Sequence, residues 1–202
     1  MEYQFNDNFL WGAASSGPQS EGTFPGDGKA EMEWDYWFKQ VPEQFFDGVG
    51  PSVTSDFYHK YKEYAKLMKE IGMNSYRTSI QWSRIFKDRE GTVNEEGVTF
   101  YQAVIDEFLS QGIEPVICLH HFDMPMYWME KGGFENRETA EGFAAFAAKC
   151  FELFGGKVKR WITFNEPIVI AEGGYIYKRH YPAVCDSKKA ALVGYHIQLA
   201  SS

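Results

Sequence analysis

The feature that most constrains the fold is a repeated order of amphipathic helix, glycine and strand-like segment. In three stretches apolar residues recur at spacings of three and four, which is the pattern of a helix with one buried face. The stretches and the glycines that follow them are 57–71 with Gly72, 101–108 with Gly112, and 143–154 with Gly155. Asn94 and Asn136 stand where N-caps are expected for the second and third helices. The order predicts successive β-strand and α-helix units.

Each glycine is followed by a short segment with strand character, and one more such segment lies near the N-terminus. The expected strands are 9–15, 74–80, 113–121 and 158–164. Strands that alternate with amphipathic helices favour a parallel sheet. The regular spacing of the units suits a (β/α) barrel, and a doubly wound sheet has the same rhythm.

Polar residues gather at one end of each expected strand. They are Gln19 and Glu21 after the first strand, Arg77 in the second, His120 and His121 at the end of the third, and Asn165 and Glu166 at the end of the fourth. Both kinds of α/β protein place their sites at the carboxyl ends of parallel strands. The pattern therefore predicts an active site at that edge of the sheet.

The number of units is too small for a closed barrel. Four βα units fit into 202 residues, whereas a barrel needs eight units and about 250 residues. We therefore expect residues 1–202 to form a single partial domain, the N-terminal (βα)4 half of a TIM (β/α)8 barrel that is truncated at Ser202.

Composition limits the partners. A hydrophobic share of 44% and an aromatic share of 17% provide a large core, while a net charge of −8 disfavours nucleic acid as a partner. No apolar run is long enough to span a membrane, and the first residues lack the pattern of a signal peptide. Three cysteines without paired spacing imply neither disulfides nor zinc. We expect a cytoplasmic protein, and the sequence leaves its oligomeric state open.

Two glycine-rich elements and one long loop complete the organisation. Gly132-Gly133 and Gly173-Gly174 lack the context of a phosphate-binding loop, and both pairs are interpreted as turns. Residues 22–50 are too aromatic for a linker. They are expected to form a structured loop over the site.

The segment Trp161–Pro167 carries the clearest chemistry, because an apolar strand delivers Asn165 and Glu166 to its end. A carboxyl bounded by apolar residues is partly desolvated, which raises its pKa and suits it to work as a general acid. The alternative is an ordinary strand-end glutamate, solvated and paired with a nearby basic residue.

Four sequence blocks resemble glycoside hydrolase family 1. The block Asn165-Glu166-Pro167 resembles the acid/base motif of a large clan of barrel glycosidases, and three further blocks narrow the resemblance to this family. They are FLWGAASSGPQSEG at 9–22, YRTSIQWSR at 76–84 and LHHFDMP at 119–125. The blocks span nearly the whole chain.

The resemblance implies roles residue by residue. Gln19 corresponds to the glutamine that binds two adjacent sugar hydroxyls, and His121 to the histidine that binds the 3-hydroxyl. Arg77 corresponds to the arginine that orients the catalytic nucleophile and keeps it ionised, and Asn165 to the residue on the 2-hydroxyl. Glu166 would be the general acid and then the general base of a retaining hydrolysis.

The family's nucleophile is not present in this chain. It belongs on the seventh strand in a Thr/Ser-Glu-Asn-Gly motif, which does not occur in these 202 residues. The chain alone is therefore expected not to hydrolyse glycosides efficiently. The resemblance implies no cofactor and no metal.

Within the family, the resemblance is strongest to bacterial 6-phospho-β-glucosidases. Phe122 stands after the substrate histidine, where many other members have Trp, and Phe122 is therefore placed in the substrate site. The implied substrates are small β-glycosides phosphorylated at the 6-position, such as cellobiose 6-phosphate and aryl β-glucoside 6-phosphates. Unphosphorylated β-glucosides or β-galactosides and 6-phospho-β-galactosides are the alternatives within the family.

Two readings from other classes stay open. A metal-dependent hydrolase could use His120, His121, Asp123 and Glu166, although adjacent strand residues point to opposite faces and cannot readily share one ion. A half-barrel that binds carbohydrate without turnover is the second alternative, since the chain has 6 Trp and 12 Tyr.

Overall fold

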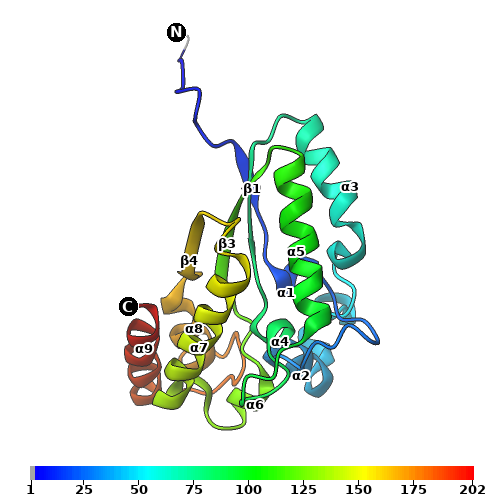
Figure 1. Ribbon diagram of the computed structural model, residues 1–202. Coiled ribbons are helices and arrows are strands. Elements are labelled where there is room, and N and C mark those ends of the chain that lie inside the picture. Colours follow the sequence, from blue (N-terminus) through cyan, green and yellow to red (C-terminus); the bar gives the residue numbers. More distant parts are fainter. Residues whose placement is uncertain (1–2) are drawn as a thin grey trace.

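The computed structural model describes residues 3–202 as one parallel sheet with helices around it (Figure 1). The strands pair in the order β1-β2-β3-β4, and they are β1 (Gly12–Ala14), β2 (Ser75–Ser79), β3 (Glu114–His120) and β4 (Arg160–Phe164). The helices are α1 (Gly17–Ser20), α2 (Glu33–Gln40), α3 (Phe57–Glu70), α4 (Trp82–Ile85), α5 (Glu95–Ser110), α6 (Met126–Met129), α7 (Arg137–Phe154), α8 (Pro167–Tyr175) and α9 (Ser187–Ser201). Three short 3-10 helices are η1 (Pro42–Gln44), η2 (Phe46–Gly48) and η3 (Gly133–Glu135).

All three strand pairs are parallel, and each pair is joined by a helical crossover. The close approach of β1 to β2 depends on Gly12, which is paired with Ser75. A Cβ at Gly12 would lie 2.1 Å from the Ser75 carbonyl oxygen, so a larger residue would push the two strands apart. The four predicted strands and their parallel arrangement are confirmed.

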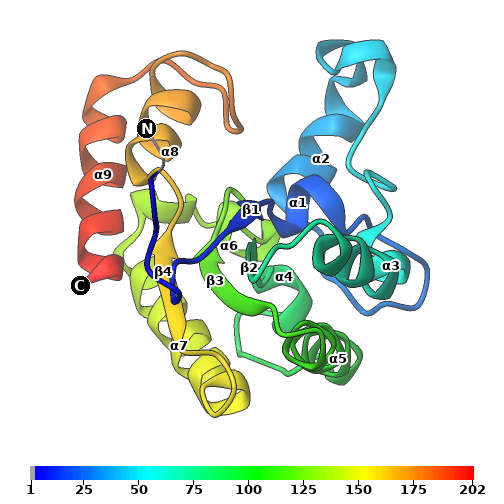
Figure 2. The same ribbon diagram turned by 90° about the horizontal axis from the view of Figure 1, so that it is seen from above.

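Helices α3, α5 and α7 follow one another along the outer face of the curved sheet (Figure 2). The core beneath them is strongly aromatic. Trp82 stacks on Phe146 with ring centroids 5.5 Å apart, and both side chains are fully buried. Burial of such large apolar surfaces supplies most of the stabilisation of a domain of this size. The predicted (βα)4 half-barrel is the observed architecture.

The helix ends agree with the sequence at most of the predicted positions. Gly72 and Gly112 adopt positive φ angles of 83° and 73°, whereas Gly155 stays right-handed with φ −60°. The Asn136 side chain caps α7 by accepting from the Glu138 N–H at 3.1 Å. Asn94 precedes α5, but its amide donates to the carbonyls of Asp27 and Arg84 instead of capping the helix.

The two glycine pairs differ. Gly132 lies in the predicted turn and Gly133 begins η3, with φ angles of 94° and 52°. The interpretation of Gly173-Gly174 as a turn was wrong, because both residues lie inside α8. A Cβ at Gly174 would lie 3.0 Å from the Tyr181 carbonyl oxygen, so the small residues let the following segment pack closely on this helix.

The long loop after β1 is structured, as expected, and contains α2, η1 and η2. An isolated antiparallel bridge between Met32 and Pro125 ties this loop, just before α2, to the segment that follows β3. Within residues 3–202, no helix has both the length and the apolar character that crossing a membrane requires.

Candidate active site

The structure brings two of the predicted site residues into direct contact. Arg77 in β2 donates from Nη2 to the Asn165 Oδ1 at 2.7 Å, although 88 residues separate them in the chain. The two residues come from strands that flank β3, so their side chains reach across the end of that strand. This hydrogen bond holds the Asn165 amide and leaves its nitrogen available to a ligand.

His121 follows β3 and is largely buried. Its backbone N–H donates to the Asp123 Oδ1 at 2.8 Å, and the other oxygen of Asp123 accepts from the Trp82 N–H at 2.8 Å. Asp123 therefore ties the ends of β2 and β3 together. Burial and the charge of Arg77 lower the pKa of His121 to about 4, so the imidazole is neutral at pH 7. A neutral imidazole can both donate to and accept from a sugar hydroxyl.

Gln19 lies on the short helix α1, which is held against the sheet by its first residue. The Gly17 N–H donates to the Ser79 Oγ at 2.8 Å, and the Ser16 hydroxyl donates to the Gln19 Oε1 at 2.9 Å. The second contact leaves the amide nitrogen of the exposed Gln19 side chain free to bind a ligand.

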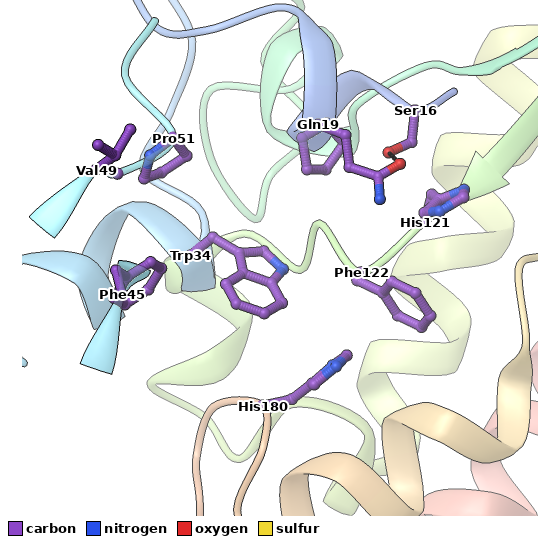
Figure 3. Close-up of a pocket in the computed structure, with 11 residues that line it drawn as sticks. Ser16, Gln19, Trp34, Phe45, Val49, Pro51, His121, Phe122 and His180 are labelled. Atoms are coloured by element: carbon purple, nitrogen blue, oxygen red, sulfur yellow. Dashed lines mark hydrogen bonds between the residues drawn. The ribbon is translucent and has the colours of Figure 1, made fainter. Parts of the chain in front are cut away.

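Gln19 and His121 line one cavity of about 400 Å³, whereas Arg77, Asn165 and Glu166 are not among its lining residues. In Figure 3, Ser16, Gln19 and His121 lie on one side, and Trp34 separates them from Phe45, Val49 and Pro51. The full lining set is Ser16, Pro18, Gln19, Trp34, Phe45, Val49, Gly50, Pro51, His121, Phe122 and His180. A cavity of this size, with few polar groups and many apolar ones, is typical of a small-molecule site.

Phe122 lines this cavity as predicted, in a strained backbone conformation. Its φ angle is 59°, which is uncommon for an aromatic residue and is frequent at functional sites. The ring contacts both His121 and His180, with centroids 5.2 Å and 5.1 Å away.

Glu166 sits directly after β4, next to Asn165, and caps the start of α8 with φ 42° and ψ 61°. The expectation of a partly desolvated carboxyl was wrong for this chain, since the Glu166 side chain is exposed. Among the four described strands β4 lies at the edge of the sheet, so none of them covers the carboxyl on that side. Burial lowers the pKa of His180, and the charge of Glu166 opposes this shift.

Glu21 and His120 also lie outside the cavity, and both are buried. Glu21 is buried and accepts from Arg84 Nε at 3.0 Å, from Gln81 Nε2 at 2.6 Å and from the Tyr101 hydroxyl at 2.9 Å. His120 points away from His121 and stacks on Phe164 with a centroid distance of 5.1 Å. Glu21 is therefore part of a buried ion-pair network, and His120 is a core residue.

The two adjacent histidines thus face different surroundings, which counts against one shared metal ion. Over the described part of the chain, no three or more His, Cys, Asp or Glu side chains gather in a way that could hold a metal.

Sequence reasoning missed Trp34 and His180. Trp34 is carried to the cavity by α2, and His180 by the segment between α8 and α9. Neither residue lies at a strand end, where the polar pattern was sought. For Trp34, the high aromatic content of residues 22–50 indicated that this loop covers the site, but it did not indicate which residue of the loop lines the cavity.

Comparison with known proteins defines the class to which this fold and site belong. The family model for glycosyl hydrolase family 1 matches residues 1–202. The chain is therefore a member of glycosyl hydrolase family 1.

Individual relatives give more detail. The chain is 50% identical over 201 residues to the protein named 6-phospho-beta-glucosidase GmuD from Bacillus subtilis (strain 168), covering 100% of the chain and 43% of the relative. It is 41% identical over 186 residues to Aryl-phospho-beta-D-glucosidase BglC from the same organism, covering 92% of the chain and 39% of the relative.

Among solved structures, a beta-glucosidase from Thermotoga maritima in complex with azafagomine superposes with a TM-score of 0.93 at 37% identity. The match covers 98% of this chain and 45% of that one. The chain thus spans less than half of the length of the relatives that it matches. Its four strands are the α/β half-barrel of this family.

Proposed function

We propose that the protein containing this chain is a retaining 6-phospho-β-glucosidase. The observation that carries the proposal is the 50% identity, over the whole chain, to a protein named as a 6-phospho-beta-glucosidase. Other relatives at 38–42% identity are named as beta-glucosidases, with no phosphate in the name, and as a 6-phospho-beta-galactosidase, so the sugar is the part of the proposal that most needs a test.

The residues of this chain bind one end of the sugar in the proposed site. Gln19 and His121 offer an amide and a neutral imidazole to adjacent hydroxyls, and Asn165 offers its amide nitrogen to the 2-hydroxyl. The contact with the 2-hydroxyl is expected to strengthen in the oxocarbenium-like transition state. Phe122 supplies an apolar wall beside them.

Glu166 is proposed as the acid/base. It protonates the oxygen of the departing alcohol while a carboxylate nucleophile attacks the anomeric carbon, and the glycosidic bond breaks as a covalent glycosyl-enzyme forms. It then takes a proton from the water that hydrolyses this intermediate. The nucleophile is provided by a part of the barrel beyond the four strands seen here, and the Arg77 guanidinium is placed to keep it ionised.

A cytoplasmic location is part of the same proposal. The three cysteines are free thiols, two of them buried and Cys185 exposed, which fits a reducing compartment. The substrate in the proposal is a small glycoside, and neither nucleic acid nor a membrane takes part.

The test compares three substrates with one leaving group on the purified full-length protein: 4-nitrophenyl β-glucoside 6-phosphate, its unphosphorylated form and its galacto isomer. We expect kcat/KM to be highest for the phosphorylated glucoside. Preference for the unphosphorylated glucoside would replace the phospho-specific reading with a plain β-glucosidase. Tight binding of these compounds with no turnover would support the non-catalytic alternative.

Glu166→Gln tests the assigned role. Turnover of substrates with poor leaving groups should fall by about 100-fold or more, because general acid catalysis contributes factors of this size. Added azide should partly restore activity on activated substrates, since a small anion can replace the water that lacks its general base. Kinetics that match the unsubstituted enzyme would contradict the role of Glu166.

A further inference from the structure

His121 and Phe122 are neighbours in the chain, yet both line the cavity. Their ring centroids lie 5.2 Å apart, and Figure 3 shows both side chains close together where β3 ends. Successive side chains of a regular strand point to opposite faces, so an extended backbone would direct only one of these two rings into the cavity. The backbone therefore has to leave the extended conformation at this point.

This change of conformation takes place at Phe122, whose φ angle of 59° lies in the left-handed region. That region is unfavourable for a residue with a side chain and is uncommon for an aromatic one. Strand pairing does not extend to this residue, because β3 pairs with β2 as far as Cys118 and with β4 as far as His120. Contacts outside the sheet therefore have to stabilise the turn at Phe122.

The carboxylate of Asp123 makes these contacts. It is fully buried, and its Oδ1 accepts from the His121 N–H at 2.8 Å. Its Oδ2 accepts from the N–H of Trp82, the first residue of α4, at 2.8 Å. The first hydrogen bond closes the turn around Phe122, and the second attaches this turn to the segment that follows β2. Asp123 thus fixes the backbone on both sides of Phe122.

The two contacts require an ionised carboxylate, since both partners of Asp123 are N–H donors. A carboxylate accepts at both oxygens, whereas an amide has one oxygen and an NH2 group that only donates. Asparagine at this position would therefore lose one of the two hydrogen bonds. Glutamate would keep the charge and place it one methylene group further from the backbone.

The turn determines how far His121 reaches into the cavity. This residue lines the cavity but is only 7% exposed, so a ligand can contact only a small part of it. A hydrogen bond to a sugar hydroxyl depends on distance and angle, and a displacement of about 1 Å is enough to lose it. The geometry of the turn is therefore expected to control the contact between His121 and a bound sugar.

We propose that Asp123 is a positioning residue for the sugar, because it holds the turn at Phe122 and thereby directs the His121 imidazole to the 3-hydroxyl. The proposal rests on the proposed function for the identity of the sugar and for the contact of His121 with this hydroxyl. Asp123 is not among the residues that line the cavity, so it acts on the sugar through His121.

The experiment compares full-length enzymes on two substrates that differ in one hydroxyl, 4-nitrophenyl β-glucoside 6-phosphate and its 3-deoxy analogue. It is carried out at pH 8, above the value of about 7 to which burial raises the pKa of Asp123, so that the carboxylate is ionised. In the unsubstituted enzyme, loss of the 3-hydroxyl should lower kcat/KM by about 10-fold to 100-fold, because a buried hydrogen-bonding group loses its partner. Asp123→Asn should lower kcat/KM for the parent substrate by about the same factor, and its own 3-deoxy penalty should be less than about 3-fold.

The ratio of the two kcat/KM values separates positioning from a structural role. A variant that is only less stable has fewer active molecules, which lowers both values equally and leaves their ratio unchanged. Asp123→Glu keeps the charge and should nevertheless show the reduced ratio of Asp123→Asn. A 3-deoxy penalty in both Asp123 variants that equals the penalty in the unsubstituted enzyme would overturn the proposal.

Asp186→Asn is the matched control. The Asp186 side chain also accepts from two backbone N–H groups, those of Lys188 and Lys189 at the start of α9, and Asp186 is not a lining residue of the cavity. This variant should keep the 3-deoxy penalty of the unsubstituted enzyme. Amide hydrogen exchange of the unsubstituted protein needs no variant to fold: the His121 and Trp82 amides should exchange at least about 100-fold more slowly than exposed amides, and equally fast exchange would overturn the proposal.

Binding distinguishes failure of this proposal from failure of the proposed function. Glucose and 3-deoxyglucose, each with and without a 6-phosphate, are titrated by calorimetry into the unsubstituted protein and into Asp123→Asn. The unsubstituted protein should bind the preferred form of glucose at least about 5-fold more tightly than its 3-deoxy analogue, and Asp123→Asn should remove this difference. This binding pattern without turnover of any glycoside refutes only the proposed function. An equal preference for the 3-hydroxyl in both proteins refutes the role of Asp123 even in an active enzyme.

Discussion

The buried carboxyl of Glu33 predicts that stability falls as the pH rises through the neutral range. Glu33 lies at the start of α2 and is 8% exposed. Burial first, and the nearby charge of Asp123 second, raise the pKa of Glu33 from its ordinary value of 4.5 to about 8. The folded protein therefore keeps a proton on Glu33 between these values, while the unfolded chain releases it.

The magnitude follows from proton linkage. Where the folded state binds one more proton than the unfolded state, the free energy of unfolding falls by about 1.4 kcal/mol for each pH unit. Glu33 alone should therefore lower this free energy by about 3 kcal/mol between pH 5 and pH 7. Its contribution is fully present below about pH 4.5 and is lost as the pH approaches 8. Burial also raises the pKa of Asp123, to about 7, which adds a decline of the same sign.

Urea unfolding of the full-length protein at pH 5, 6, 7 and 8 measures this effect. Glu33→Gln replaces the carboxyl with an amide that does not titrate, so its free energy of unfolding should decline less steeply than that of the unsubstituted protein. Glu43→Gln changes an exposed glutamate on η1 and should follow the unsubstituted protein. If the curves for Glu33→Gln and the unsubstituted protein stay a constant distance apart from pH 5 to pH 8, the reasoning is refuted.

Two further predictions rest on glycines in close contact. A Cβ at Gly17 would lie 2.4 Å from the Gln81 Cγ. Gly17→Ala should therefore shift α1, which carries Gln19, and raise KM for the sugar by about 5-fold to 10-fold. An unchanged KM would show that α1 accommodates the methyl group without moving Gln19. A Cβ at Gly142 would lie 2.2 Å from the Trp128 Cζ2, so Gly142→Ala should cost about 1–3 kcal/mol in urea unfolding. Gly156→Ala meets nothing within 4 Å and is the control for this measurement; equal costs for both would contradict the packing argument.

The parts of the fold that the sequence predicted are those with local causes. Apolar periodicity placed α3, α5 and α7, and the segments after their glycines placed β2, β3 and β4, with boundaries that differ by a few residues. A helix that buries one face has apolar residues at spacings of three and four within its own segment, so the sequence of that segment is enough to predict it. The prediction of Gly173-Gly174 as a turn failed because these glycines are in close contact with residues 180–182, and no local sequence pattern indicates this contact.

The residues of the candidate site also fall into two groups, those that the sequence predicted and those that depend on contacts between distant segments. Arg77, His121 and Asn165 could be named in advance because strand ends converge by topology, and the hydrogen bond from Arg77 to Asn165 is the direct result. Trp34 and His180 belong to loops whose paths depend on packing against other loops. Their contact joins residues 146 positions apart in the chain, since 180 − 34 = 146. Such a contact forms only in the folded protein, and no regular spacing in the sequence predicts it.

Glu21 shows that polar residues of one sequence motif can have different roles, because some of them bind a ligand and others only stabilise the fold. Gln19 and Glu21 belong to the same sequence block at 9–22, yet one lines the cavity and the other is 1% exposed. The Glu21 carboxylate satisfies Arg84, whose guanidinium also donates to Asp27 at 2.8 Å and to the Gly22 carbonyl at 2.9 Å. Removing one partner of a buried pair leaves the other charge uncompensated, which is strongly destabilising. The network therefore fixes the chain directly after α1, and the position of Gln19 in the cavity depends on an ion pair whose residues do not line the cavity.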